Sequence, residues 1–272
     1  MKTVNNKILT FLNIEEPIET IVGSAVNLAK TFQAEVNFFY VKKKIDATRT
    51  ENQLDVMRTM AIEQKAVQKL KNVLTQKQKN TDAKLSYTIT EGPLKKTVQS
   101  KLDSYRPDMV VLGKRTPNVY RVVGKQITEL VLKNFNGPVL IAHPSRVLEI
   151  EEDLSVGVLN DLDSILENKV SNTLMKQSKA PLKLFRIDDT TPSTADVKPP
   201  GTKTIDYRFE NNQNALKNLT TYVHKNNVHL LCVERTKDNP SSKNLKLKQV
   251  IKHVNTSMLM VGRNDSNNII KV

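Results

Sequence analysis

Residues 108–143 read DMVVLGKRTPNVYRVVGKQITELVLKNFNGPVLIAH, and residues 229–262 read HLLCVERTKDNPSSKNLKLKQVIKHVNTSMLMVG. Each stretch has an apolar run of strand length, a polar loop, a helical stretch, an Asn with two small or Pro residues, and a second apolar run. The two halves also start alike, because 7–13 (KILTFLN) parallels 154–160 (LSVGVLN). Self-similarity over such a length indicates a duplicated structural unit. The chain therefore holds two copies of one α/β unit.

The copies differ in the interval between their second and third strands. Four pairs set the alignment: Asn13 with Asn160, Val41 with Ile187, Tyr87 with Tyr207, and Gly113 with Glu234. The offset falls from 147 and 146 at the first two pairs to 120 and 121 at the last two. The first copy fills the extra length with 54–78, where apolar residues recur near helical spacing. The second copy has 188–203, rich in Asp, Thr and Pro, which indicates a loop.

Strands and helices alternate along both copies. We expect strands at 7–12, 35–41, 85–90, 108–112, 138–142, 154–159, 182–187, 204–209, 229–233 and 257–261, and helices at 17–32, 54–78, 93–104, 124–134, 163–178, 211–226 and 243–253. This alternation predicts an α/β fold in which each copy is a doubly wound, five-stranded parallel sheet. The expected domains are 1–147 and 148–272, the second lacking one helix. In such sheets, ligands bind beyond the carboxyl ends of the strands.

Composition narrows the class of protein. The chain is 38% hydrophobic, and no apolar run approaches the ~20 residues that a membrane span requires. Its single Cys232 lies in an apolar strand pattern, which excludes a disulfide framework and favours a cytoplasmic location. Residues 1–147 hold 24 Lys and Arg against 13 Asp and Glu, whereas 148–272 hold 18 against 15. The first copy is therefore the one in which to seek an anionic partner.

The order of these segments resembles the universal stress protein family. The resemblance rests on KILTFLN at 7–13, a helix ending near LAKTFQAEVNFFYV, the segment EGPLKKTVQSKLDSYRPDMVVLGKR, and GKQITELVLKNFNGPVLIAH. It covers most of 5–145 and, more weakly, 153–263. It implies a flavodoxin-like sheet, a tandem stress-response protein and no established catalytic reaction. Family members pair through their last strand, so we expect 138–142 to pair with 257–261 within this chain, and a homodimer stays possible.

The resemblance also implies what an ATP site would need. Nucleotide-binding members carry an Asp after the first strand and a loop of the form G-x2-G-x9-G-[ST]. Here Asn13 replaces that Asp, Gly113 keeps the first glycine, and Thr116 replaces the second. Ten residues separate Gly113 from Gly124, against twelve in the ATP pattern, and Gln126 replaces the small hydroxyl. The pattern favours the branch of the family that does not bind ATP.

The carboxyl edge of the first copy is nevertheless basic. Its candidate anion site comprises Asn13, Gly113, Lys114, Arg115, Thr116, Gly124 and Lys125. Lys42, Lys43, Lys44 and Arg121 add further charge near this edge. Gly124 and Lys125 would open a helix, whose free N–H groups favour anions. Two interpretations stay open: solvated surface cations, or a site for ATP, phosphate or an acidic partner. In the second copy, Glu234 replaces the first glycine and would repel phosphate.

Other classes of function have weaker support. His143, His224, His229 and His253 lie in separate elements without metal-ligand spacing, so we expect no metal site. There is no nucleophile elbow or ordered triad, and we expect no catalytic residues. Only 5% of residues are aromatic, and no DNA-binding motif is present, so specific nucleic-acid binding is not expected. The sequence predicts a non-catalytic protein without a cofactor that acts through protein contacts, with an ATP or anion sensor as the alternative.

The absence of one helix from the second copy leads to one more expectation. Without a counterpart of 54–78, one face of the second sheet is less covered, and apolar side chains there would need shielding. We expect either the segment 190–204 or a partner subunit to provide it.

Overall fold

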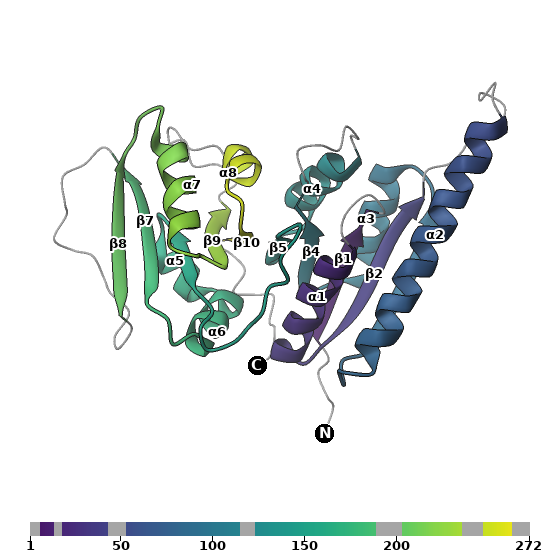
Figure 1. Ribbon diagram of the computed structural model, residues 1–272, viewed down its shortest axis with the longest axis horizontal. Coiled ribbons are helices and arrows are strands. Elements are labelled where there is room, and N and C mark those ends of the chain that lie inside the picture. The colour runs from purple at the N-terminus through teal and green to yellow at the C-terminus, as the bar shows by residue number, and fades with distance from the viewer. Residues whose placement is uncertain are drawn as a thin grey trace. The chain divides into compact units, whose positions relative to one another are not determined.

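The computed structural model describes residues 6–13, 18–42, 53–114, 123–188, 203–235 and 247–262 (Figure 1). The chain divides into two compact units. Unit 1 runs to Phe135 and includes Pro144–Val147, while unit 2 contains Asn136–His143 and continues from Leu148. We retain 1–147 and 148–272 as the proposed extents of the two sequence copies. Among the described residues, no helix has the length and apolarity needed to cross a bilayer.

Unit 1 contains a parallel sheet with the strand order β3-β2-β1-β4. The strands are β1 (Asn6–Leu12), β2 (Ala34–Lys42), β3 (Leu85–Glu91) and β4 (Met109–Gly113), and the helices are α1 (Ile18–Phe32), α2 (Gln53–Gln78), α3 (Leu94–Tyr105) and α4 (Val123–Asn134). The apolar runs of β1, β2 and β4 are buried almost throughout, as expected for strands covered on both faces.

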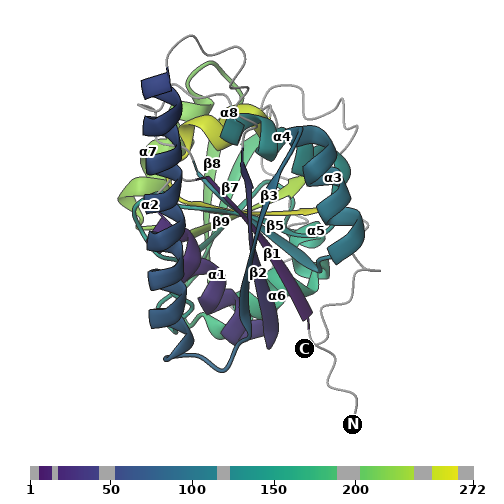
Figure 2. The ribbon, with the colours of Figure 1, turned by 90° about the vertical axis from the view of Figure 1, so that its right-hand side faces the viewer.

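The helices of unit 1 cover both faces of its sheet. Figure 2 shows α1 and α2 on one side of the strands and α3 and α4 on the other, and the pairs α1·α2 and α3·α4 are in contact. Helix α1 is buried along most of its length, and its Gly23 lies so close to Val147 that an added Cβ would approach the Val147 Cγ1 to 2.9 Å. On α2, by contrast, Leu70 and Leu74 are buried while most other side chains reach solvent.

Unit 2 contains a sheet with the order β5-β10-β9-β6-β7-β8. Its strands are β5 (Val139–Ala142), β6 (Val156–Leu159), β7 (Leu182–Asp188), β8 (Thr204–Glu210), β9 (Leu230–Arg235) and β10 (Ser257–Gly262), and its helices are α5 (Leu162–Glu167), α6 (Lys169–Gln177), α7 (Ala215–Lys225) and α8 (Leu247–His253). β5 and β10 run antiparallel, with Leu140 opposite Leu259. The predicted pairing of the two last strands is confirmed.

One predicted helix is in fact two. The expectation of a single helix over 163–178 is wrong, because α5 ends at Glu167 and α6 begins at Lys169. Between them Asn168 has an extended backbone (φ −77°, ψ 125°), and its side chain accepts hydrogen bonds from the N–H groups of Val170 and Ser171. An Asn side chain that bonds the main chain in this way begins a new helix.

The connection from β7 to β8 bears on the missing helix. It runs from Asp188 to Thr204 and is shorter than α2 alone, which has 26 residues. Most of this connection, including 189–202, lies outside the described residues, so the predicted shielding by 190–204 stays a prediction.

The strand β8 is polar on the face in question. Tyr207 and Phe209 contact Tyr222 of α7, so strand alternation places Asp206 and Arg208 on the opposite face. There the Oδ2 of Asp206 lies 3.4 Å from the Nε of Arg186 on β7 and 3.5 Å from the Nη2 of Arg208. The expectation of apolar side chains needing a cover is therefore wrong for β8, because charged residues at this sheet edge can remain in water.

The strand registers correct two of the four matches between the copies. Phe11 pairs with Phe39 and Leu159 pairs with Phe185. Taking the Val41–Ile187 match as fixed, Phe39 is equivalent to Phe185, so Phe11 is equivalent to Leu159. The neighbouring pairs Phe11–Leu112 and Leu159–Val233 give the same result from the Gly113–Glu234 match.

Asn13 therefore corresponds to Asp161, not to Asn160. By the same reasoning Thr88, which pairs with Phe39, corresponds to Tyr207, which pairs with Phe185. Both sequence matches were wrong by one residue, a slip that would put each side chain on the opposite face of its strand.

Candidate functional site

The strand order of unit 1 defines where a ligand would bind. The chain moves from β1 to β2 and β3 on one side, and then returns to β4 on the other side of β1. In open α/β sheets, ligands bind at such a reversal, beyond the carboxyl ends of the two central strands. Because Phe11 pairs with Leu112, continuing the register brings Asn13 beside Lys114 at this point.

Three predicted site residues lie at these strand ends. Asn13 follows β1 and is half-buried, Gly113 ends β4, and Lys114 comes next. The side chain of Lys114 is buried, with the residue only 7% exposed, and burial lowers its pKa to about 8. The lysine remains mostly protonated at neutral pH. This cation belongs to a residue at the carboxyl end of β4 and is partly desolvated.

The start of α4 supplies the other predicted residues. Gly124 and Lys125 lie in its first turn, where backbone N–H groups have no partner within the helix. Their backbone is described, but their side chains are not. Arg115 and Thr116 lie outside the described residues. The structure therefore places Asn13, Gly113 and Lys114 at adjacent strand ends, and places Gly124 and Lys125 at a helix start.

Of the remaining cations of this edge, Lys42 lies among the described residues and has an acidic partner. Lys42 ends β2, and its Nζ lies 3.5 Å from a carboxylate oxygen of Glu63 on α2. Glu63 is buried, whereas the Lys42 side chain is 34% exposed, so the pair joins β2 to α2 near the surface. Lys43, Lys44 and Arg121 lie outside the described residues.

In unit 2, the residues at the equivalent positions make hydrogen bonds within the fold. Arg235, equivalent to Lys114, is 7% exposed, and its Nη2 donates to the carbonyl oxygens of Asn136 at 2.7 Å and Gly137 at 3.4 Å. Asp161 caps α5, accepting from the backbone N of Ser164 at 3.1 Å and from the Ser164 Oγ at 2.9 Å. Neither role follows from the sequence as the two copies were first aligned. A one-residue shift in the alignment would have revealed Asp161.

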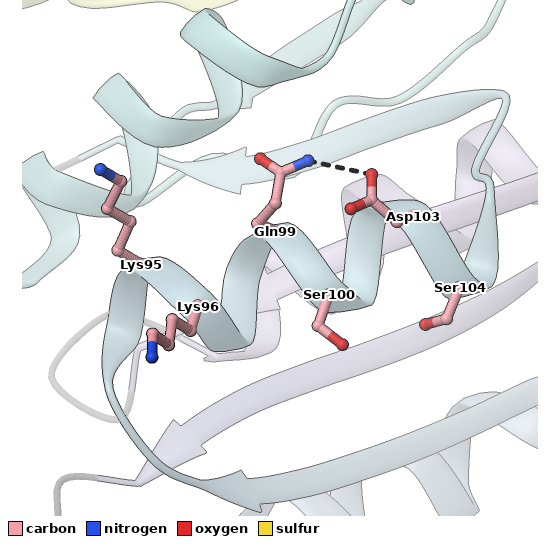
Figure 3. A pocket seen from close by; sticks show the side chains of 6 residues that line it. All are labelled: Lys95, Lys96, Gln99, Ser100, Asp103 and Ser104. Atoms are coloured by element: carbon pink, nitrogen blue, oxygen red, sulfur yellow. Dashed lines mark hydrogen bonds between the residues drawn. The ribbon is translucent and has the colours of Figure 1, made fainter.

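A cavity of 710 Å³ lies along α3. Its described lining residues are Lys95, Lys96, Gln99, Ser100, Asp103 and Ser104 (Figure 3). Gln99 is already engaged, because its amide donates to the Asp103 carboxylate at 2.9 Å. All of these side chains come from one helix, so the cavity is a surface hollow and not a site between β1 and β4.

Within the described parts of the chain, no group of three or more His, Cys, Asp or Glu residues could hold a metal ion. His229 accepts a hydrogen bond at Nδ1 from the backbone N of Ser155. Cys232 is fully buried, and burial raises the pKa of its thiol to about 12. A thiol with so high a pKa is unreactive at neutral pH.

Comparison with known proteins supplies the family. The model of the universal stress protein family matches residues 7–143. A comparison with curated proteins finds no match. The crystal structure of a universal stress protein from Archaeoglobus fulgidus DSM 4304 is similar at a TM-score of 0.64 and 14% identity, with 96% of this chain and 98% of that chain covered. A functionally unknown protein from Pseudomonas aeruginosa PAO1 is similar at a TM-score of 0.57 and 10% identity, with 97% and 94% covered.

Proposed function

The chain belongs to the universal stress protein family, and from this premise we propose that it is a non-catalytic stress-response protein that acts through protein contacts and has a degenerate nucleotide site. The family assignment and the matching α/β fold support the stress-response role. The proposal on the nucleotide site rests on the residues at the strand ends.

One observation carries the nucleotide part of the proposal. The nucleotide-binding pattern requires an Asp after the first strand, but unit 1 has Asn13 there. Unit 2 does have an acid, Asp161, yet its two carboxylate oxygens bond to Ser164 as the cap of α5. At this position, therefore, unit 1 has no carboxylate, and the carboxylate of unit 2 is engaged in the cap of α5. The acid Glu234 at the end of β9 would further repel phosphates from the second copy.

Isothermal titration of ATP into the full chain tests this proposal. We expect no binding tighter than about a few micromolar, which corresponds to roughly −8 kcal/mol. Tighter binding would overturn the degenerate site. Incubation with ATP, followed by chromatography for ADP, tests the non-catalytic character in the same sample, and ADP formed in proportion to the protein would contradict it.

The alternative is a sensor of ATP or another anion in unit 1. The buried cation of Lys114 and the N–H groups at the start of α4 favour it. Inorganic phosphate is the simplest probe. Under this alternative, Lys125→Glu should abolish phosphate binding, and added salt should weaken it, because exposed charges are screened within ~8 Å at physiological ionic strength. Lys133→Glu, the same charge change in the last turn of α4, is the matched control.

A further inference from the structure

The strand β8 forms the outer edge of the unit 2 sheet. Among the described strands it pairs with β7 alone, and it ends the strand order of the sheet. All of its residues, Thr204–Glu210, are in register with β7. The other side of β8 has no described strand beside it, and the backbone groups on such an edge are a template for a further strand.

One hydrogen bond to β7 shows which residues of β8 point outward. The backbone N of Leu182 donates to the carbonyl oxygen of Lys203 at 2.8 Å, so this carbonyl faces β7. From one residue to the next, the N–H and C=O groups of a strand point to alternate sides. The backbone groups of Ile205, Tyr207 and Phe209 therefore face β7 as well. The residues whose backbone groups point to the outer edge are Thr204, Asp206, Arg208 and Glu210.

The order of these outward residues makes β8 complementary to itself. When a second β8 runs antiparallel with Tyr207 on the twofold axis, each Asp206 lies opposite an Arg208. Each Thr204 then lies opposite a Glu210. Each of these pairs joins two residues with outward backbone groups, so it can exchange both of its N–H···O=C bonds. Opposite charges directly across two strands also stabilise their pairing.

The neighbouring registers bring like charges together. A shift by two residues keeps the same backbone groups paired, but it sets Asp206 opposite Asp206 in one direction and Arg208 opposite Arg208 in the other. In the register centred on Tyr207, like charges lie on the diagonals at about 7–8 Å, whereas opposite charges lie about 5.5 Å apart. The charges of β8 thus disfavour other strands and leave one register open to β8 itself.

The contacts of Asp206 within its own chain are compatible with this pairing. Asp206 contacts Arg186 and Arg208, yet its side chain stays 32% exposed and that of Arg208 31%. A carboxylate has about four acceptor sites and a guanidinium has five N–H donors, so each group can take a second partner. Cations and carboxylates would then alternate across the joined edge.

The other face of β8 is apolar and fits the same register. Ile205 is 41% exposed and shares the α7 face with Tyr207 and Phe209. The register sets Ile205 opposite Phe209 of the second copy, which removes the exposed Ile205 side chain from water. In β3 of unit 1 the equivalent positions carry hydroxyl groups, namely Ser86, Thr88 and Thr90.

We propose that β8 pairs with β8 of a second copy, antiparallel and centred on Tyr207, and so joins two chains edge to edge. The occupant is a second copy because the charge pattern of the strand is complementary to its own reverse. This interface is separate from the pairing of β5 with β10 inside one chain, and it does not depend on the proposed nucleotide site.

Sedimentation velocity of the full chain over a range of concentrations tests this proposal. We expect a species of twice the 30.8 kDa chain mass. Asp206→Arg should raise the Kd of this dimer at least ~10-fold, because it sets like charges opposite each other twice. Adding Arg208→Asp restores opposite charges and should return the Kd to within about threefold. The matched control is Asp103→Arg, the same charge change on α3 of unit 1, which should leave the Kd unchanged.

An introduced cysteine reports the register independently. Tyr207→Cys places two thiols across the axis, where the Cα atoms are about 4.5 Å apart and a disulfide fits. Ile205→Cys places them roughly 14 Å apart, which is too far. The natural Cys232 is fully buried and should not interfere. We expect mild oxidation to crosslink the first variant and not the second on a non-reducing gel, with circular dichroism showing that both are folded.

Four results would overturn the inference. A wild-type chain that stays monomeric at every concentration has no such interface. A dimer that Asp206→Arg leaves intact forms through another surface, and loss of the dimer in Tyr87→Arg would assign that surface to β3. A dimer that the single and double variants weaken equally would show that charge does not select the partner. Equal crosslinking of the two cysteine variants would show that the register is wrong.

Discussion

Lys114 shows how burial changes the meaning of a basic residue. The sequence placed it among loop cations, but in the fold it is almost completely shielded from solvent at the end of β4. Burial lowers its pKa to about 8 from 10.5. Because the pKa of Lys114 is lower in the folded state, burial of its charge destabilises the fold fully below pH 8. This destabilisation is lost as the pH rises from 8 toward 10.5.

This linkage predicts a pH dependence of stability. Between about pH 7 and about pH 9.5, the titration of Lys114 should raise the free energy of unfolding by roughly 2 kcal/mol. Lys114→Met should remove this gain. Urea unfolding of both proteins at the two pH values measures it, and the difference between them isolates Lys114 from Lys101 and Lys183, whose pKa values burial also lowers. Parallel pH profiles would show that the Lys114 charge costs the fold nothing.

At the scale of the element, Asn168 divides what the sequence read as one helix. Its side-chain oxygen accepts two backbone N–H bonds that would otherwise be left unmade at the start of α6. Asn is only mildly unfavourable inside helices, so helical periodicity alone did not reveal the break. The same side chain therefore decides both where α5 stops and where α6 starts.

Asn168→Ala should destabilise unit 2 by about 1 kcal/mol, in the range of other N-cap removals. Asn168→Asp, which keeps the accepting oxygen, should cost only a fraction of this. Chemical denaturation monitored by circular dichroism gives the free energy of unfolding of the two variants. An Ala variant as stable as the wild type would mean that tertiary packing, and not the cap, holds the start of α6.

The sequence predicted the strands within about two residues, and most of them, the outer strands β3 and β8 excepted, are buried apolar runs as expected in a parallel sheet. It misaligned the copies at Asn160 and Tyr207 because identical letters were matched instead of alternating faces. The structure places Gly113 and Lys114 at the carboxyl end of β4, and their role in binding an anion stays a prediction. The burial of Lys114 and the internal hydrogen bonds of Arg235 depend on segments far along the chain, which no local pattern could show.

At the scale of the whole molecule, the antiparallel pairing of β5 with β10 removes two unpaired sheet edges. Unpaired edges invite association with other chains. The outer strand β8 is protected differently, by alternating charged residues such as Asp206 and Arg208. Buried side chains such as Leu140 and Leu259 then make β5–β10 part of the core and not a surface contact.

Cutting the chain after residue 147 should expose the edge of β5. We expect the fragment 1–147 to form a dimer through this strand, because Val139, Leu140 and Ile141 lose the partner strand that they have in the intact protein. Sedimentation velocity gives its mass, with the intact chain measured alongside and circular dichroism showing that the fragment is folded. A folded fragment that sediments as a monomer would contradict the expectation.

Because β5 and β10 belong to one chain, their pairing does not depend on the concentration of the protein. Separate subunits that meet edge to edge come apart when few copies are present, since their association depends on protein abundance. Covalent linkage replaces that abundance by a fixed effective concentration. The paired strands are thus as complete at a low concentration of the protein as at a high one.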